Sequence, residues 1–173
     1  MVKDRGLADG RAAETGPHDV ATARALVGAQ FALLALIVLL PARSDWPVPA
    51  GLRALTLAGA VVGLTVMVLG ATALGRGLTA LPLPNRQAQL RTGGLYRWVR
   101  HPIYSGLLLT AGSISAGSGS ILRAVAFVLL VALLTIKARW EEARLERRFD
   151  GYAEYARRTP RFLPLPRRSP PPR

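Results

Sequence analysis

The chain has 173 residues, half of them hydrophobic and 6% aromatic, with a formal net charge of +13. It has no cysteine, and its two histidines, His18 and His101, lie far apart, so disulfides and thiolate metal sites are excluded and no protein-held metal is expected. Such a charge favours nucleic-acid binding in a soluble protein. Here the hydrophobic residues form long runs, so we assign the basic residues to membrane flanks and lipid headgroups and expect no nucleic-acid partner.

The first half of the chain predicts a tail and two membrane spans. Residues 1–20 are polar and mixed in charge, which is typical of a disordered cytoplasmic tail. Residues 21–40 predict the first span, with sixteen uncharged residues after Arg24. Residues 54–74 predict the second span, with 21 uncharged residues in a row. Gly59 and Gly63 in this span form a G-x-x-x-G pair, a weak sign of close helix packing.

The second half begins with a loop at 75–100 that has five arginines and no acidic residue, which indicates the cytoplasmic side. Two shorter apolar segments, 102–116 and 121–136, then flank four turn residues and predict a helical hairpin. A charged helix is expected from Lys137 onward, and residues 165–173 predict a disordered Pro/Arg tail. The domain plan is therefore two spans at 21–74, a core at 75–164 and two tails.

These elements predict an all-α polytopic membrane protein with about four transmembrane helices, including the short hairpin, and a cytoplasmic carboxy-terminal helix. With the amino terminus inside, three of the 23 Lys and Arg residues lie in outer loops, namely Arg43, Arg53 and Arg123. This asymmetry predicts a multi-pass cell-membrane protein with both termini in the cytoplasm.

Arg100 and His101 come directly before Pro102, a residue favoured at the first position of a helix. The positive end of the helix dipole, free backbone N–H groups and Arg100 would together suit a carboxylate or phosphate. The alternative is that Arg100 and His101 only anchor the span to lipid headgroups, and the residues alone leave both interpretations open.

Glu141 and Glu142 lie where the fourth span is expected to leave the membrane. They could bind a hydroxyl-bearing or cationic ligand. Alternatively, they belong to a solvated helix, in which Lys137 and Glu141 form an ordinary pair four residues apart. Because a short hairpin returns its two ends to nearly the same place, we expect Arg100 and His101 to lie close to Glu141 and Glu142. That convergence favours a site.

The sequence here resembles the integral-membrane methyltransferases of the isoprenylcysteine carboxyl methyltransferase and phospholipid methyltransferase group. The resemblance covers about residues 78–164, roughly half of the chain. It rests on Gly94-x-Tyr96, Arg100-His101-Pro102-x-Tyr104-x-Gly106, an apolar hairpin, Glu141-Glu142-x-x-Leu145, Phe149, Tyr152, Tyr155 and Arg161-x-x-Pro164.

The resemblance implies methyl transfer from S-adenosylmethionine, bound on the cytoplasmic side, to a lipophilic acceptor that arrives from the bilayer. It implies that the cofactor pocket is lined by Leu90, Arg91, Tyr96, Arg100, His101, Pro102, Ile103, Tyr104 and Glu141. Lys137 and Glu142 are the expected catalytic residues, which orient the acceptor. Lys137 stands where the family tends to carry arginine, and the segment Asp150-Gly151-Tyr152 is shorter than the family pattern. No metal is required.

Two other classes of function compete with the enzyme. A small four-span exporter of lipophilic cations needs a carboxylate within a span, and none of the ten acidic residues lies within a predicted one. A non-catalytic membrane anchor or lipid-binding scaffold needs only the basic surface, and binding of S-adenosylmethionine would separate it from the enzyme.

Overall fold

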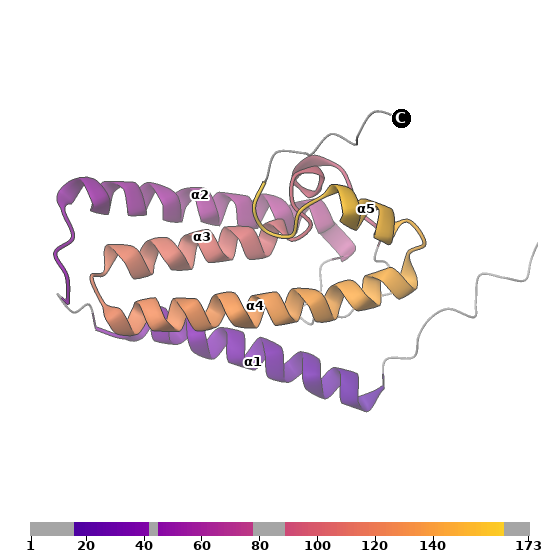
Figure 1. The fold of residues 1–173 in the computed structure, drawn as a ribbon, viewed down its shortest axis with the longest axis horizontal. Coiled ribbons are helices and arrows are strands. Elements are labelled where there is room, and N and C mark those ends of the chain that lie inside the picture. The colour runs from indigo at the N-terminus through magenta and orange to yellow at the C-terminus, as the bar shows by residue number, and fades with distance from the viewer. Residues whose placement is uncertain (1–15, 42–44, 78–88, 165–173) are drawn as a thin grey trace, which may run out of the picture.

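A computed structural model describes residues 16–41, 45–77 and 89–164 of the chain. The described residues form α1 (Pro17–Leu39), α2 (Ala50–Leu74), α3 (Pro102–Gly117), α4 (Ile121–Arg148) and α5 (Tyr152–Arg158), with short 3-10 helices η1 (Gly75–Gly77) and η2 (Gly94–Arg97). The four longer helices run side by side as a bundle, and α5 and η2 lie together at one end of it (Figure 1). The expected all-α class is confirmed.

Three helices, α1, α2 and α4, are long and apolar enough to cross a membrane. Many of their large apolar side chains face outward, among them Phe31, Leu57 and Val128, which are 64%, 68% and 64% exposed. In a protein of this composition such side chains are the surface that meets lipid. The chain is a polytopic membrane protein, as predicted.

The fourth expected span, α3, has 16 residues. At 1.5 Å per residue it is about 24 Å long, which is less than the ~30 Å of a typical hydrocarbon core. Its far end nevertheless reaches the level of the α1–α2 connection, because the Asp45 backbone N–H donates to Gly119 O at 2.9 Å. Asp45 Oδ2 also accepts a hydrogen bond from the Ile121 N–H at 2.8 Å, at the start of α4.

Several element boundaries differ from those that the sequence predicted. Helix α1 begins at Pro17, so residues 17–20 are helical and not part of a tail, because proline suits the first position of a helix. Helix α4 runs unbroken past residue 136 to Arg148, since Ala, Arg, Leu and Glu are strong helix formers. The expected tails at 1–15 and 165–173 lie outside the described residues.

Helices α2 and α3 pack with their backbones in close approach. A Cβ atom added to Gly63 would lie 2.7 Å from Gly106 O, and one added to Gly106 would lie 2.4 Å from Gly63 O. Only glycine fits at these two positions, so the close packing that the G-x-x-x-G pair indicated is confirmed. This contact fixes the second turn of α3 against the middle of α2, and Gly70, nearer the end of α2, lies against Pro102 and Ile103 at the start of α3.

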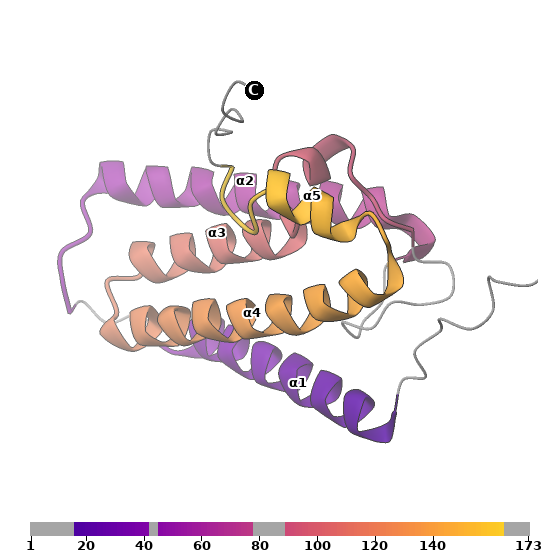
Figure 2. The same cartoon turned by 45° about the vertical axis from the view of Figure 1, so that its right-hand side comes forward.

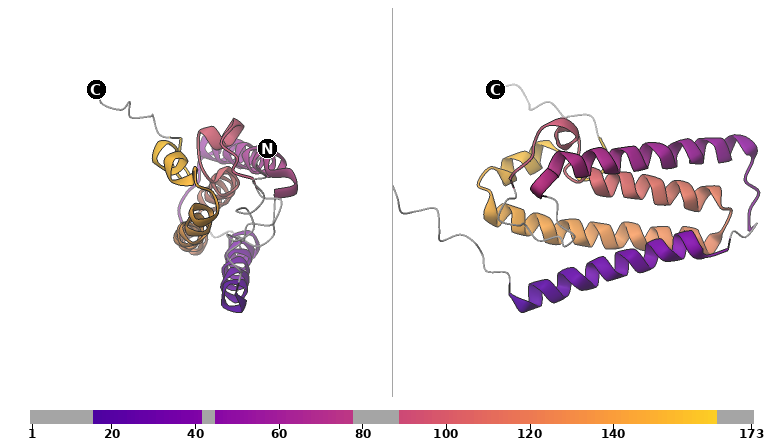
Figure 3. Two further views of the ribbon diagram at one scale, coloured as in Figure 1. Left: turned by 90° about the vertical axis from the view of Figure 1, so that its right-hand side faces the viewer. Right: turned by 180° about the vertical axis from the view of Figure 1, so that it is seen from behind.

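Helix α4 lies between two neighbours, with α3 on one side and α1 on another (Figure 2). The view from behind in Figure 3 shows α1 running alongside α4, and α2 running alongside α3. The core between these helices contains Ile37, Ala111, Ala126, Leu130 and Leu134. Because α1 lies against α4, its polar residues can reach the end of the bundle where α3 begins.

Candidate active site

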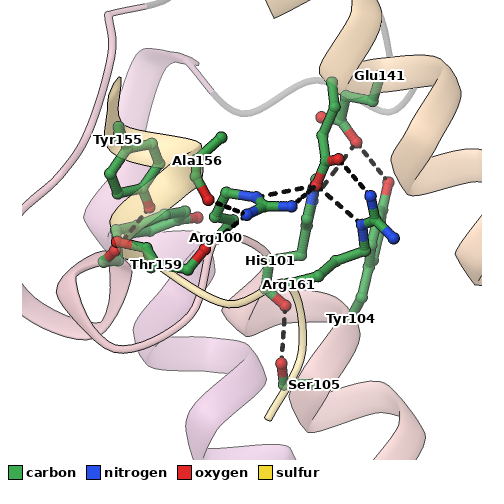
Figure 4. A network of polar contacts seen from close by, with 11 residues as sticks. Arg100, His101, Tyr104, Ser105, Glu141, Tyr155, Ala156, Thr159 and Arg161 are labelled. Atoms are coloured by element: carbon green, nitrogen blue, oxygen red, sulfur yellow. Dashed lines mark hydrogen bonds and ion pairs between the residues drawn. The ribbon is translucent and has the colours of Figure 1, made fainter. Parts of the chain in front are cut away.

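The α3–α4 hairpin brings the start of α3 and the polar end of α4 together, as the sequence predicted. Glu142 Oε1 accepts hydrogen bonds from Arg100 Nε and His101 Nε2, both at 3.0 Å. It also accepts one from Arg161 Nε at 3.0 Å, and Glu142 Oε2 accepts one from Arg161 Nη2 at 2.6 Å. We call Arg100, His101, Glu142 and Arg161 the Glu142 network; Figure 4 shows its arginines and histidine converging on α4.

The Glu142 network is largely buried. The side chains of His101, Arg100 and Glu142 are 8%, 11% and 12% exposed, and that of Arg161 is 27% exposed. The hydrogen bond to Glu142 raises the pKa of Arg161, while burial opposes that shift. A buried carboxylate with two guanidinium partners is ionised and only accepts hydrogen bonds, so Nε2 of His101 carries its proton toward Glu142.

The residues after α5, 159–162, form a segment that we call the C-terminal strap, which crosses the start of α3. The Arg100 N–H donates to Pro160 O at 2.9 Å, and the His101 N–H donates to Arg161 O at 3.1 Å. Arg100 Nη1 donates to Thr159 O at 2.5 Å, and Ser105 Oγ donates to Phe162 O at 2.7 Å. The two N–H groups that precede Pro102 therefore bind carbonyls of the chain itself.

His101 lies between two carboxylates. While Nε2 faces Glu142, Nδ1 lies 3.9 Å from Glu141 Oε2, which also accepts a hydrogen bond from the Tyr104 hydroxyl at 2.9 Å. The ring of Tyr104 stacks on the ring of His101 at 5.2 Å and 3° between planes. Glu141 is 25% exposed, twice as much as Glu142, so it is the carboxylate of the pair with capacity for a further partner.

Lys137 lies one turn before Glu141 on α4 and is buried, with 5% of its surface exposed. Its ammonium donates a hydrogen bond to Gln30 Oε1 of α1 at 2.6 Å. The same ammonium lies 5.1 Å from the centroid of the Tyr104 ring. Lys137 therefore adjoins Tyr104 on the side toward α1.

Three tyrosines, Tyr96, Tyr152 and Tyr155, contact one another near the C-terminal strap. The Tyr96 hydroxyl donates to Gly70 O at 3.2 Å, and the Tyr155 hydroxyl donates to Tyr96 O at 2.6 Å. The buried Tyr152 hydroxyl has no hydrogen-bond partner among the described residues. Burial raises the pKa of Tyr152, and the negative charge of Glu142 raises it further, while Arg100 lowers it.

The remaining predicted cofactor residues take different positions. Pro102 is fully buried, and Ile103 packs against Gly70 of α2. Leu90 lies beside Gly151, with its Cδ2 atom 3.8 Å from the place of a Cβ atom there, whereas Arg91 is exposed. The structure thus gathers Arg100, His101 and Tyr104 around the carboxylates of Glu141 and Glu142, whereas Tyr96 contacts Gly70 and Tyr155. Within the described parts of the chain, neither Leu90 nor Arg91 forms a hydrogen bond or ion pair with the residues around the two carboxylates.

Two partners of the predicted site residues were not assigned a role from the sequence. In the sequence Arg161 is part of the Arg-x-x-Pro pattern and nothing more, but in the structure it makes a two-point contact with Glu142. Gln30 is the one amide side chain in the apolar run of 21–40, and that isolation is the signal that could have singled it out.

A model of the phospholipid methyltransferase family matches residues 52–151, which is more than half of the chain. The chain belongs to the phospholipid methyltransferase family. The match begins in α2 and ends just before α5, so it includes the α3–α4 hairpin, Arg100, His101, Glu141 and Glu142, but not α1 or the C-terminal strap.

Three curated relatives are similar to part of this chain. The nickel-cobalt-cadmium resistance protein NccN of Alcaligenes xylosoxydans xylosoxydans is 37% identical over 105 residues, covering 58% of this chain and 49% of its own. The cobalt-zinc-cadmium resistance protein CzcN of Cupriavidus metallidurans is 36% identical over the same shares of both chains. Protein-S-isoprenylcysteine O-methyltransferase B of Arabidopsis thaliana is 33% identical over 114 residues, covering 60% of this chain and 58% of its own. The chain thus spans about half the length of these relatives.

Proposed function

We propose that this member of the phospholipid methyltransferase family transfers a methyl group from S-adenosylmethionine to a lipophilic acceptor at the membrane surface. The observation that carries the proposal is the placement of His101 between Glu141 and Glu142, with Tyr104 stacked on its ring. At a solvated helix end the side chains of Arg100, His101 and Glu142 would be exposed to water. Here they are largely buried and paired with one another, as buried charges must be. We assign the methyltransferase core to residues 75–164 and the preceding two spans to 21–74.

The residues at the site fit the cofactor. Glu141 is partly exposed and has carboxylate capacity beyond its bond from Tyr104, which suits the hydroxyl or amino groups of the cofactor. The ring of Tyr152 packs against that of Tyr155, and its buried hydroxyl has no partner among the described residues, so it is available to donate a hydrogen bond to a ligand oxygen. We propose that these two groups, with Tyr96, His101 and Tyr104, hold the cofactor.

When bound, S-adenosylmethionine supplies a sulfonium methyl group, whose bond to sulfur breaks as its bond to the acceptor nucleophile forms. The task of the chain is then to align the two molecules and to keep water out, which is the main source of rate in a direct displacement. The Glu142 network serves this task by fixing His101 and the C-terminal strap. We propose that Lys137 and Glu142 orient the acceptor, Lys137 by direct contact and Glu142 through its arginine partners.

The distribution of basic residues between the two ends of the bundle indicates on which side of the membrane the site lies. The network end of the bundle carries most of the described basic residues, including Arg139, Arg147 and Arg157, whereas Arg53 and Arg123 lie at the other end. We therefore propose that the site faces the cytoplasm of a cell membrane, with both termini on that side. The acceptor then enters from the inner leaflet.

Calorimetry in detergent tests the proposal directly. S-adenosylmethionine should bind to the wild type, and Glu141→Gln should weaken binding by roughly tenfold through loss of a charge-assisted hydrogen bond. Glu154→Gln is the matched control, because Glu154 pairs with Arg157 and Arg158 on the exposed side of α5. A non-catalytic anchor or scaffold would give no heat with any of the three proteins.

The acceptor can be sought in the same preparation. Donor with a labelled methyl group is added to membranes with and without the protein, and the lipid fraction that gains label contains the acceptor. If S-adenosylmethionine binds and no lipophilic fraction gains label, the proposed acceptor class is wrong.

A further inference from the structure

Three polar contacts join α1 to α4 along its length. Arg144 pairs with Asp19 at 2.5 Å near the start of α1, and Lys137 donates to Gln30 at 2.6 Å in its middle. Arg123 Nε donates to Leu40 O at 3.1 Å, just after α1 ends. The three residues on α4 are separated by multiples of seven positions, so they share one helix face.

These contacts specify how α1 sits on α4. The spacing of 11 positions between Asp19 and Gln30 is close to three helical turns, so these two residues share one face of α1, and Arg123 binds the Leu40 carbonyl where the helix has just ended. A slip or rotation of α1 would separate all three pairs at once. Because a polar group within a span is costly without its partner, the matching pattern holds α1 in a single register.

The middle contact reaches the candidate active site. The Lys137 ammonium has three donors, and among the described residues Gln30 is its hydrogen-bond partner. It also lies over the Tyr104 ring, whose hydroxyl donates to Glu141. A continuous series of contacts thus leads from Gln30 through Lys137 and Tyr104 to Glu141. Helix α1 lies outside the residues that the family model matches.

We propose that Gln30 is a positioning residue that holds the Lys137 ammonium beside Tyr104, so that α1 forms one wall of the acceptor side of the site. This inference rests on the proposed function. With one donor bound to Gln30, two donors of Lys137 remain for an oxygen of the acceptor. Acceptor recognition in this chain then depends on a helix that the shared family region does not include.

The test compares substitutions of Gln30 that differ in one property. Gln30→Met keeps the length and apolar volume of the side chain but removes the oxygen that accepts from Lys137. Gln30→Glu retains an acceptor oxygen and is the conservative rescue. Asp19→Asn is the matched control, since it weakens another contact of the same α1–α4 seam without touching Lys137.

Methyl transfer is measured with labelled donor while a total membrane lipid extract is titrated as the source of acceptor. Gln30→Met should raise the half-saturating amount of extract by roughly tenfold, with unchanged affinity for S-adenosylmethionine. Gln30→Glu and Asp19→Asn should both stay within about twofold of the wild type. The inference is overturned if Gln30→Met and the wild type have the same half-saturating amount of extract. It is also overturned if Gln30→Met and Asp19→Asn raise that amount equally, because the effect would then come from the packing of α1 in general.

A second readout does not depend on catalysis. The chain has two lysines, Lys3 and Lys137, so Lys3→Arg leaves Lys137 as the single lysine. The rate at which an amine-reactive reagent modifies Lys137 should rise several-fold in Gln30→Met and stay low in Asp19→Asn. If wild-type protein neither binds the cofactor nor transfers label, the proposed function fails, whereas an unchanged modification rate in Gln30→Met means that Gln30 does not hold Lys137.

Discussion

Arg161 and Glu142 form a two-point ion pair, in which Nε lies 3.0 Å from Oε1 and Nη2 lies 2.6 Å from Oε2. The pair connects α4 to the C-terminal strap, so it closes the chain around the start of α3. The same carboxylate also binds Arg100 and His101. Glu142 is therefore the point at which three separate segments of the chain meet.

The first prediction concerns the stability that Glu142 supplies. Glu142→Gln keeps the shape of the side chain but leaves Arg100 and Arg161 without their counter-charge. We expect a loss of about 2–4 kcal/mol in the free energy of unfolding, somewhat less than for a fully buried pair because Arg161 is 27% exposed. This free energy is measured by titrating the detergent-solubilised protein with dodecyl sulfate and monitoring the loss of helix by circular dichroism. Glu154→Gln is the control and should cost at most about 1 kcal/mol; equal losses in both variants would contradict this account of the network.

The second prediction concerns the α2–α3 contact. Gly106→Ala would place a Cβ atom 2.4 Å from Gly63 O and 2.6 Å from Met67 N, so the backbones must separate. We expect a loss of about 1–3 kcal/mol or more, and a smaller yield of folded protein. Gly28→Ala, where nothing lies within 4 Å of the added atom, should not lower the free energy of unfolding, and it should raise it by up to about 1 kcal/mol because alanine is the better helix former within α1. An unaffected Gly106→Ala protein would show that the backbones of α2 and α3 are far enough apart at Gly63 and Gly106 to admit a methyl group.

The third prediction concerns alkaline pH. Burial raises the pKa of Tyr155 to about 12, although Arg100 lowers it, whereas a phenol in an unfolded chain has a pKa of about 10. The folded pKa is the higher one, so this contribution to stability is fully present below pH ~10 and is lost as the pH rises through ~12. Ultraviolet absorbance of the phenolate should lag behind that of unfolded protein over this range. Tyr155→Phe should lose less stability across the same window; identical titration of native and unfolded protein would be the contrary result.

The fourth prediction concerns topology. The chain has no cysteine, so a single introduced thiol has a unique position. Thr92→Cys lies at the exposed network end, and Ala116→Cys lies at the exposed far end of α3. In intact cells, a membrane-impermeant thiol reagent should label the cysteine at 116 and reach the one at 92 only after lysis. Labelling of both from outside would mean that α3 does not cross the bilayer.

Much of this arrangement could be predicted from residue patterns. Uncharged runs longer than a bilayer needs predict α1 and α2 regardless of their neighbours, because lipid leaves no other way to satisfy the backbone. The short hairpin predicted that Arg100 and His101 meet Glu141 and Glu142, and the ion pairs confirm it. The residues at which helices begin and end, such as Pro17 of α1 and Arg148 of α4, are less well predicted, because helix propensity changes gradually along the sequence.

The pairing of side chains from distant segments was decided only by the tertiary structure. The sequence predicts that Arg100 and His101 lie near Glu142, but it gives no reason to expect that Arg161, 19 positions later, binds the same carboxylate at two points. It gave no reason to connect Gln30 with Lys137, 107 positions away, since that contact depends on how α1 is rotated on α4. Hydrophobic length and charge asymmetry are local properties that a sequence contains in full, whereas the rotation of one helix on another arises from all of their contacts together.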